Sequence, residues 1–193
     1  MRCTEIIVED HIQIRRALDV VDGMLNKLES GQRIEVFDAK NVLKFLREFA
    51  DQYHQVMEDS VLYPALLLLA TPDNPALLQF VSDHCGERSL VSEIEEALLS
   101  RQGMAFFRGA QELTALLRSH CEREESILSS LAERSLSKEQ DEQIAAEFLS
   151  RRAQLEHELN FSRLERLYPI KPVSEPVRVF QAAARHVPER APL

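Results

Sequence analysis

The sequence predicts an all-α protein organised as an up-down-up-down four-helix bundle. Its composition suits helices, because it holds five glycines and no tryptophan and is rich in Leu, Glu, Ala and Arg. Apolar residues recur at helical spacing over four long segments, which short breaks connect. No alternating strand pattern of useful length is present, and the best strand candidate is the short stretch 177–180 near the C-terminus.

The first helix is expected over residues 4–28, with Thr4 as a suitable N-cap and Gly31 marking the end of the pattern. Apolar residues at steps of seven, four, three and four form one stripe along this helix, and His11 lies on it. A lone histidine on such a stripe is more often a satisfied core residue than a metal ligand, so its role depends on the other histidines.

The second helix is expected over residues 36–63. Pro64 ends or kinks it, because proline has no N–H and clashes with the preceding turn. The apolar residues 65–70 then continue the segment for a further turn or two. The sequence TPDNP at 71–75 is a clear break, which separates the first two helices from the next two.

The third helix is expected over residues 75–100, with Asn74 as its cap and a proline at the first helical position. His84 lies in the middle of its inward stripe, where a leucine would otherwise be expected. Gly103 separates this helix from the fourth, which is expected over residues 104–134.

A fifth helix is expected over residues 138–167, because Ser137 and Gln140 have the spacing of a capping box. After Tyr168 the chain holds five prolines in its last 25 residues, a composition typical of a poorly packed tail or a surface arm. The expected organisation is a bundle of residues 1–134, an additional C-terminal helix within 135–168 packed on the bundle, and a Pro-rich tail of 169–193.

Charge and composition exclude several partners. The net charge of −9 argues against nucleic acid, since binding phosphates needs a basic face. No apolar stretch approaches the length of a membrane span, and the N-terminus has no apolar secretory region. Three cysteines at unrelated spacings do not form a disulfide framework, so we expect a protein of the reducing cytoplasm.

A short phrase occurs twice, as HQVMEDSVL from His54 and as HCEREESIL from His120. Positions four apart lie on one helix face, so each histidine shares a face with a glutamate, Glu58 or Glu124. A single pair of this kind is most simply a solvated contact worth a few tenths of a kcal/mol. The repeat, together with the apolar residues around each copy, favours two inward-facing halves of a metal site instead.

The four histidines on inward stripes are expected at one level of the bundle. His11 lies about 17 residues before the end of its helix, and His54 about 18 after the start of the next. His84 and His120 each lie about 16 residues from the corresponding break. Because neighbouring helices joined by short loops run antiparallel, all four imidazoles meet in one layer.

A longer repeat indicates two similar helical hairpins about a pseudo-twofold axis. His11 and His84 are each followed four residues later by an arginine, Arg15 or Arg88, so the motifs H-x-x-x-R and H-x-x-x-E alternate along the chain. The expected core holds two metals, each with two histidines, bridged by Glu58, from the second helix, and Glu124, from the fourth.

This arrangement resembles the hemerythrin-like (HHE cation-binding) domain family, whose pattern is H…H-x-x-x-E…H…H-x-x-x-E on four helices. The run EDSVLYP after His54 is similar to that family's acidic-then-L-[FY]-P ending. The resemblance covers roughly residues 5–134 and implies two iron ions in an oxo- or hydroxo-bridged pair. It implies that His11 and His54 bind one iron, that His84 and His120 bind the other, and that Glu58 and Glu124 bridge them.

One departure from the family's oxygen carriers bears on function. They have a fifth histidine four residues from the one on the third helix, where this chain has Arg88 on one side and Phe80 on the other. Two histidines per iron leave open positions for water, O2, peroxide or NO, which favours the redox, peroxide-reactive or NO-reactive members. The family's iron–sulfur repair factors carry an extra N-terminal cysteine-containing domain, for which there is no room before His11.

Several other residues have two interpretations. Arg15 and Arg88 either donate to a bridging carboxylate or bound anion, or form salt bridges at the bundle edge. Tyr53 and Tyr63 either hydrogen-bond a bound oxygen species or pack in the core, and Glu87 is a possible extra carboxylate. Cys85 and Cys121 are expected to be small buried hydrophobes, with a redox role as the alternative. No ligand role is expected for His157 or His186.

Three functions are consistent with these patterns. The first is a diiron protein that binds or reduces O2, peroxide or NO. The second is an iron, oxygen or NO sensor, or an iron-handling module, without sustained turnover, which signals through its fifth helix and tail. The third is a structural bundle without metal. The same nitrogen and oxygen ligands also accept zinc or manganese.

Overall fold

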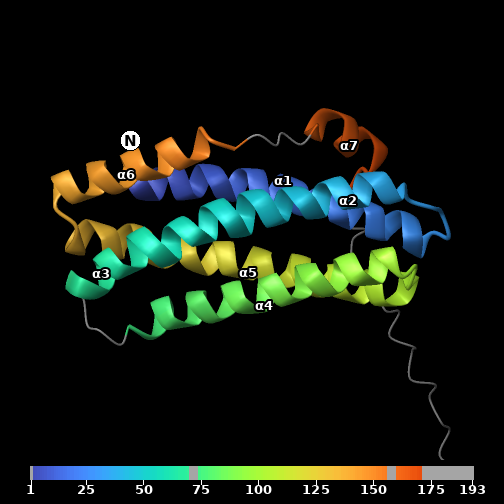
Figure 1. Cartoon of the computed structure of the whole chain (residues 1–193), viewed down its shortest axis with the longest axis horizontal. Helices are drawn as coiled ribbons and strands as arrows, with labels where there is room; N and C mark the ends of the chain where they lie inside the picture. Colours follow the sequence, from blue (N-terminus) through green and yellow to red (C-terminus); the bar gives the residue numbers. More distant parts are fainter. Residues whose placement is uncertain (1, 70–73, 156–159, 171–193) are drawn as a thin grey trace, which may run out of the picture.

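The computed structural model describes residues 2–69, 74–155 and 160–170, and within these ranges all secondary structure is helical. Figure 1 shows the long helical segments side by side, with successive segments running in opposite directions along the long axis. The predicted all-α bundle is confirmed. Among the described helices, none is long and apolar enough to cross a membrane.

Three of the four predicted bundle helices agree with the structure to within one residue at each end. The second segment and the C-terminal part of the chain differ. In chain order the elements are α1 (Cys3–Glu29), α2 (Val36–Phe45), η1 (Leu46–Gln55), η2 (Glu58–Leu62), α3 (Tyr63–Leu69), α4 (Pro75–Leu99), α5 (Gly103–Ser135), α6 (Lys138–Arg152) and α7 (Phe161–Leu167).

The second segment is not the single α-helix that was predicted over 36–63. Its elements η1 and η2 are π-helical, with wider turns than an α-helix, and the helix continues through Pro64 into α3. Pro64 therefore lies inside a continuous helical segment, directly after the π-helical turn η2. π-Helical turns are frequent at functional sites, and these two carry His54 and Glu58.

The prediction of one helix over 138–167 is wrong, because α6 and α7 are separate. The predicted capping box does begin α6, where the Ser137 hydroxyl accepts the N–H of Gln140 at 3.2 Å. A second cap begins α7, since the Asn160 side chain accepts the N–H of Arg163 at 3.0 Å. Helix α6 packs on α1 and η1, and α7 packs on α1. The predicted tail lies outside the described residues from position 171 onward.

The segment after α6 is held to the bundle by a buried carboxylate. Asp38 on α2 is fully buried and accepts from the Arg163 guanidinium at 2.6 Å and from the Tyr168 hydroxyl at 2.9 Å. The backbone of Tyr168 lies directly against Gly23 on α1, where a Cβ would be 2.0 Å from the Tyr168 carbonyl oxygen. The glycine is therefore required for this close approach.

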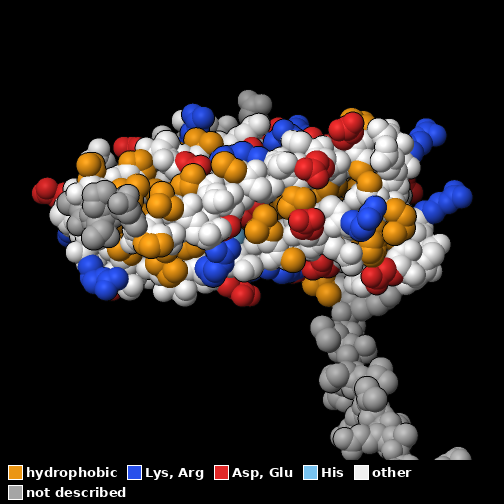
Figure 2. Space-filling view, turned by 90° about the horizontal axis from the view of Figure 1, so that it is seen from below, with side chains coloured by type: hydrophobic (Ala, Val, Ile, Leu, Met, Phe, Trp, Pro, Cys, Tyr) orange, Lys and Arg blue, Asp and Glu red, His pale blue; other side chains and the backbone are white. Residues whose placement is uncertain are grey.

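Figure 2 shows one long face of the molecule, on which apolar, acidic and basic side chains are interspersed. No described histidine is visible on this face. The four histidines that the sequence places on inward stripes are all buried, each with 1% or less of its surface exposed.

We expect Gly23→Ala to destabilise the protein by about 1–3 kcal/mol, because the added methyl group must displace Tyr168. Gly86→Ala is the control. Its Cβ would meet only the Leu116 side chain at 3.5 Å, and alanine is favoured by about 1 kcal/mol inside a helix. Urea unfolding measures both changes, and equal shifts for the two variants would contradict the close contact at Tyr168.

Candidate metal centre

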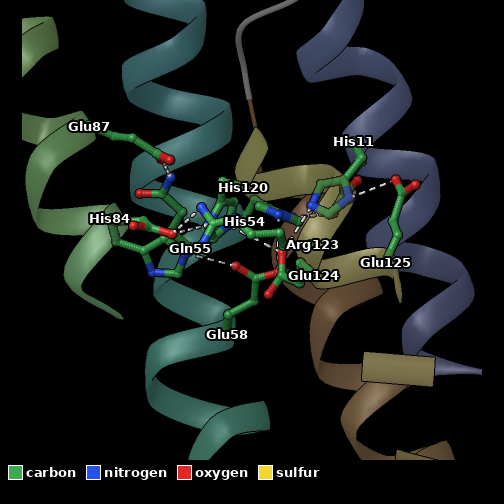
Figure 3. A network of polar contacts seen from close by, with 12 residues as sticks. His11, His54, Gln55, Glu58, His84, Glu87, His120, Arg123, Glu124 and Glu125 are labelled. Atoms are coloured by element: carbon green, nitrogen blue, oxygen red, sulfur yellow. Dashed lines mark hydrogen bonds and ion pairs between the residues drawn. The ribbon is translucent and has the colours of Figure 1, made fainter. Parts of the chain in front are cut away.

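Six buried side chains from five elements meet at the middle of the bundle (Figure 3). Each is exposed by 1% or less, so water does not solvate them. The helices bring together the four histidines and two glutamates that the alternating motifs predicted as ligands. We call these the six centre residues: His11 on α1, His54 on η1, Glu58 on η2, His84 on α4, and His120 and Glu124 on α5.

The Nε2 atoms of the four imidazoles face the two glutamates. The Glu58 carboxylate lies between His54 and His84, whose Nε2 atoms are 3.1 and 3.5 Å from its two oxygens. One oxygen of Glu124 lies between His11 and His120, at 3.2 and 3.3 Å from their Nε2 atoms. Each carboxylate therefore stands between one histidine from each half of the bundle.

The outer nitrogen, Nδ1, of every centre histidine also faces a carboxylate. A carboxylate at neutral pH only accepts hydrogen bonds, so Nδ1 carries a proton, which leaves Nε2 as the nitrogen that each ring in its neutral form can offer to a metal. Metal-binding histidines in proteins are held in this way. The Nδ1 partners are Glu125 for His11 at 2.9 Å, Asp10 for His54 at 3.4 Å, Asp59 for His84 at 2.9 Å and Asp83 for His120 at 3.5 Å.

The sequence analysis missed these four carboxylates, although the sequence carries a signal for them. An aspartate directly precedes the histidine in both α1 and α4, and an acidic residue directly follows the glutamate in both repeats of the phrase. Asp10 and Asp83 each serve the histidine of the following helix. Asp59 and Glu125 cross to the other hairpin. Each of these acidic residues is thus next to one candidate ligand in the sequence but contacts a histidine on another helix.

Arg15 and Arg88 hold the two crossing carboxylates. Arg15 donates to Glu125 at 2.8 Å, and Arg88 donates to Asp59 at 3.1 Å. Among the described contacts, neither guanidinium reaches Glu58 or Glu124. Both arginines form salt bridges at the bundle edge, and they affect the histidines only through the carboxylates that they bind.

The other two carboxylates are held in different ways. Arg123, on α5, donates to Asp83 at 2.7 Å. Arg152 lies on α6, outside the bundle, and is 3.3 Å from Asp10. The arginine that binds Asp83 therefore comes from the second half of the bundle itself. The arginine that pairs with Asp10, in the first half, comes from the C-terminal segment.

Of the remaining candidates, Tyr63 contacts the centre and Glu87 does not. The Tyr63 hydroxyl donates to Glu124, and burial raises the pKa of this phenol far above its ordinary value, so it stays a neutral donor. Glu87 is absent from the described ligand groups and accepts from Gln55 instead. The ring of Tyr53 packs against Phe49.

The cysteines lie outside the two described ligand groups. Cys121 is buried, as expected, but the expectation is wrong for Cys85, which is exposed. Cys121 lies beside His11 of α1, whereas Cys85 lies on a face of α4 that is exposed to solvent. His157 and His186 lie outside the described residues.

The pKa values of the two central glutamates, Glu58 and Glu124, are shifted in opposite directions. Burial and the nearby charge of Glu124 raise the pKa of Glu58 well above its ordinary value. Burial alone would also raise the pKa of Glu124, but the nearby imidazoles of His11 and His120 bring it well below its ordinary range. Burial lowers the pKa of His54, which favours the neutral, metal-binding form of its imidazole.

The centre is chemically incomplete without a cation. Within the described residues, five inward atoms make no hydrogen bond: Nε2 of His11 and of His54, both oxygens of Glu58, and one oxygen of Glu124. The Nε2 atoms of His84 and His120 face each other at 3.2 Å, where two lone pairs would repel. Nitrogen and oxygen donors converging on two adjacent positions fit a pair of divalent metal ions.

Comparison with known proteins identifies the domain. The family model described as the hemerythrin HHE cation-binding domain matches residues 3–132, which is most of the chain. No curated protein and no solved structure matches the chain significantly.

In the metal-free protein we expect Glu58→Gln to stabilise the fold by about 1 kcal/mol or more at pH 8, because it removes a poorly solvated carboxylate. A carboxyl with a raised pKa binds more protons in the folded state, so its cost grows as pH rises above its ordinary pKa. The gain should therefore be larger at pH 8 than at pH 5. Urea unfolding at both pH values measures it.

Glu124→Gln is the matched comparison, and we expect it to destabilise the metal-free protein by about 2 kcal/mol. This carboxylate is stabilised by His11, His120 and Tyr63, and an amide replaces it poorly. Equal losses of folding stability in the two glutamine variants would contradict the opposite pKa shifts of Glu58 and Glu124.

Proposed function

The chain belongs to the hemerythrin HHE cation-binding domain family, and on that premise we propose that it is a non-haem diiron protein that binds or reduces O2, peroxide or NO. One observation carries the proposal. Four imidazoles have their outer nitrogens facing carboxylates, and their four Nε2 atoms surround two buried glutamates.

The proposed ligand set divides along the pseudo-twofold axis. His11 and His54 would hold one ion, and their ring centroids are 4.9 Å apart. His84 and His120 would hold the other, with centroids 4.8 Å apart. Glu58 and Glu124 each lie between one histidine of either pair, which supports bridging roles for both carboxylates.

The proposed ligand set leaves coordination positions open on each metal ion, where a small molecule can bind and react. Two histidines and the shared carboxylates leave each ion short of six ligands, so small molecules have room to bind. A ferrous pair supplies two electrons together, which matches the reduction of peroxide to water. The protein would orient the imidazoles through their Nδ1 partners and hold Glu124 through the Tyr63 hydroxyl.

A sensor without sustained turnover is the second candidate, and one contact favours it. Arg152 on α6 forms an ion pair with Asp10, which positions His54, so a change at the centre can alter how α6 packs. Reaction with an excess of peroxide or NO separates the two candidates, since an enzyme turns over many times and a sensor does not.

We propose the cytoplasm as the compartment. The three cysteines are all free thiols, as is usual in a reducing environment. The acidic chain and the mixed charges of the face in Figure 2 fit a small inorganic ligand better than a nucleic acid.

Purified, iron-loaded protein should hold two irons per chain and show the visible absorption of an oxo-bridged diferric pair. We expect Glu124→Gln to lose much of this iron, because a proposed bridging carboxylate is gone. Glu122→Gln, at an exposed position of the same helix, should keep it. Elemental analysis and absorption spectra measure both, and wild-type protein without iron, or with zinc or manganese in its place, would refute the diiron proposal.

Asp59→Asn and Glu125→Gln should each weaken iron binding about 10–100-fold, because the imidazoles of His84 and His11 lose their anionic partners. Asp51→Asn is the control. Asp51 also binds Arg88, at 2.6 Å, but has no described contact with a histidine. Competition with a chelator measures the affinities, and an equal effect of all three substitutions would assign the loss to general destabilisation.

A further inference from the structure

A cavity of about 210 Å³ opens between η1 and α4 on one side of the centre. Its outer part is lined by partly exposed charged side chains, including Asp51 and Arg88, which bond to each other at 2.6 Å. Its inner part is lined by Gln55 and Glu87, which are only 2% and 3% exposed. The cavity thus leads from a polar surface to a buried polar pair.

This pair presents two hydrogen-bond acceptors that lack donors. The Gln55 amide donates to one oxygen of Glu87. Among the described residues, the other oxygen of Glu87 and the amide oxygen of Gln55 have no hydrogen-bond partner. A buried acceptor without a donor costs about 1–3 kcal/mol, so a donor bound in the cavity would be stabilised here.

The pair also adjoins the centre. Gln55 directly follows His54, and Glu87 lies one helical turn after His84. Figure 3 shows both side chains beside the centre histidines. Burial raises the pKa of Glu87 to about 7, against the opposing effect of the nearby His120 imidazole, so near neutral pH this carboxyl exists in both protonation states.

We propose that this cavity is the entry to the centre for a small neutral molecule with O–H donors, of the class of hydrogen peroxide, and that Gln55 and Glu87 receive it. The inference rests on the proposed function and narrows it, because O2 and NO have no hydrogen to donate. The volume holds several molecules of this size, since one water occupies about 30 Å³ of liquid.

The reaction that this entry would serve is the reduction of hydrogen peroxide, for which the proposed centre would supply the electrons. Cleavage of the O–O bond of hydrogen peroxide to give two water molecules takes two electrons and two protons. A ferrous pair held by the six centre residues would supply the two electrons and become diferric, and solvent would supply the two protons. The cavity connects the buried pair with solvent, so protons can follow the same route as the peroxide.

Anaerobic mixing of reduced, iron-loaded protein with hydrogen peroxide tests the proposal, with the growth of diferric absorption as the signal. Glu87→Leu removes an acceptor and should slow this reaction about tenfold or more. Ala50→Leu narrows the cavity but keeps the polar pair, and should slow it too. Glu93→Gln, exposed on the same helix, is the control and should react like the wild type.

A second measurement needs no iron. In the metal-free protein near pH 6, infrared spectra should show the carbonyl band of the protonated Glu87 carboxyl, identified by its loss in Glu87→Gln. We expect hydrogen peroxide to shift this band in the wild type. An unshifted band at saturating peroxide would refute binding at this pair, whatever the iron content.

The outcomes separate this inference from the proposed function. Variants that keep two irons but react with peroxide as fast as the wild type overturn the entry and leave the diiron proposal standing. Wild-type protein that binds no iron refutes the diiron proposal, while the infrared shift still decides whether the pair binds peroxide. If Glu87→Leu slows the reaction with O2 by the same factor, the preference for O–H donors is wrong.

Discussion

The structure depends on the fixed orientation of four buried imidazoles. Each ring has an acidic partner at Nδ1, and this partner determines where the proton lies. The Nε2 atoms then point at two buried glutamates and at one another, an arrangement that attracts a cation and is costly without one. The helices, their capping residues and the bundle core bring these groups together, and a bound metal would compensate for their burial.

The centre has pseudo-twofold symmetry, and this symmetry is broken at the arginines that pair with its two aspartates. Both hairpins supply an aspartate before a histidine and a second acid after a glutamate. The two aspartates are then balanced by different arginines, Arg123 within the bundle and Arg152 on α6. The C-terminal segment therefore touches only one half of the ligand set among the described residues. This asymmetry is one source of a difference in affinity between the two candidate metal positions.

The surroundings of the centre also differ from one side to another. On one side Tyr63 donates to Glu124, and its ring stacks on the ring of His84. On another side the cavity ends at Gln55 and Glu87, whose polar atoms are not all satisfied. A closed, apolar side protects a buried metal site from water, whereas a polar opening gives a small reactant a path to it. The π-helical turns of η1 and η2 carry residues of both the centre and the cavity.

The sequence by itself determined the helical class, the three regular bundle helices and the six centre residues, because these depend on local periodicity, on caps and on a repeated spacing. Only the tertiary structure decided the π-helical turns, the division of the last predicted helix and the pairing of each histidine with an acid on another helix. Such pairings join residues distant in sequence, and their partners depend on helix rotation and crossing, which a one-dimensional pattern does not contain. For the same reason Cys85 and Cys121, equivalent in sequence, differ in burial, since Cys121 lies beside His11 of α1 and Cys85 lies on an exposed face of α4.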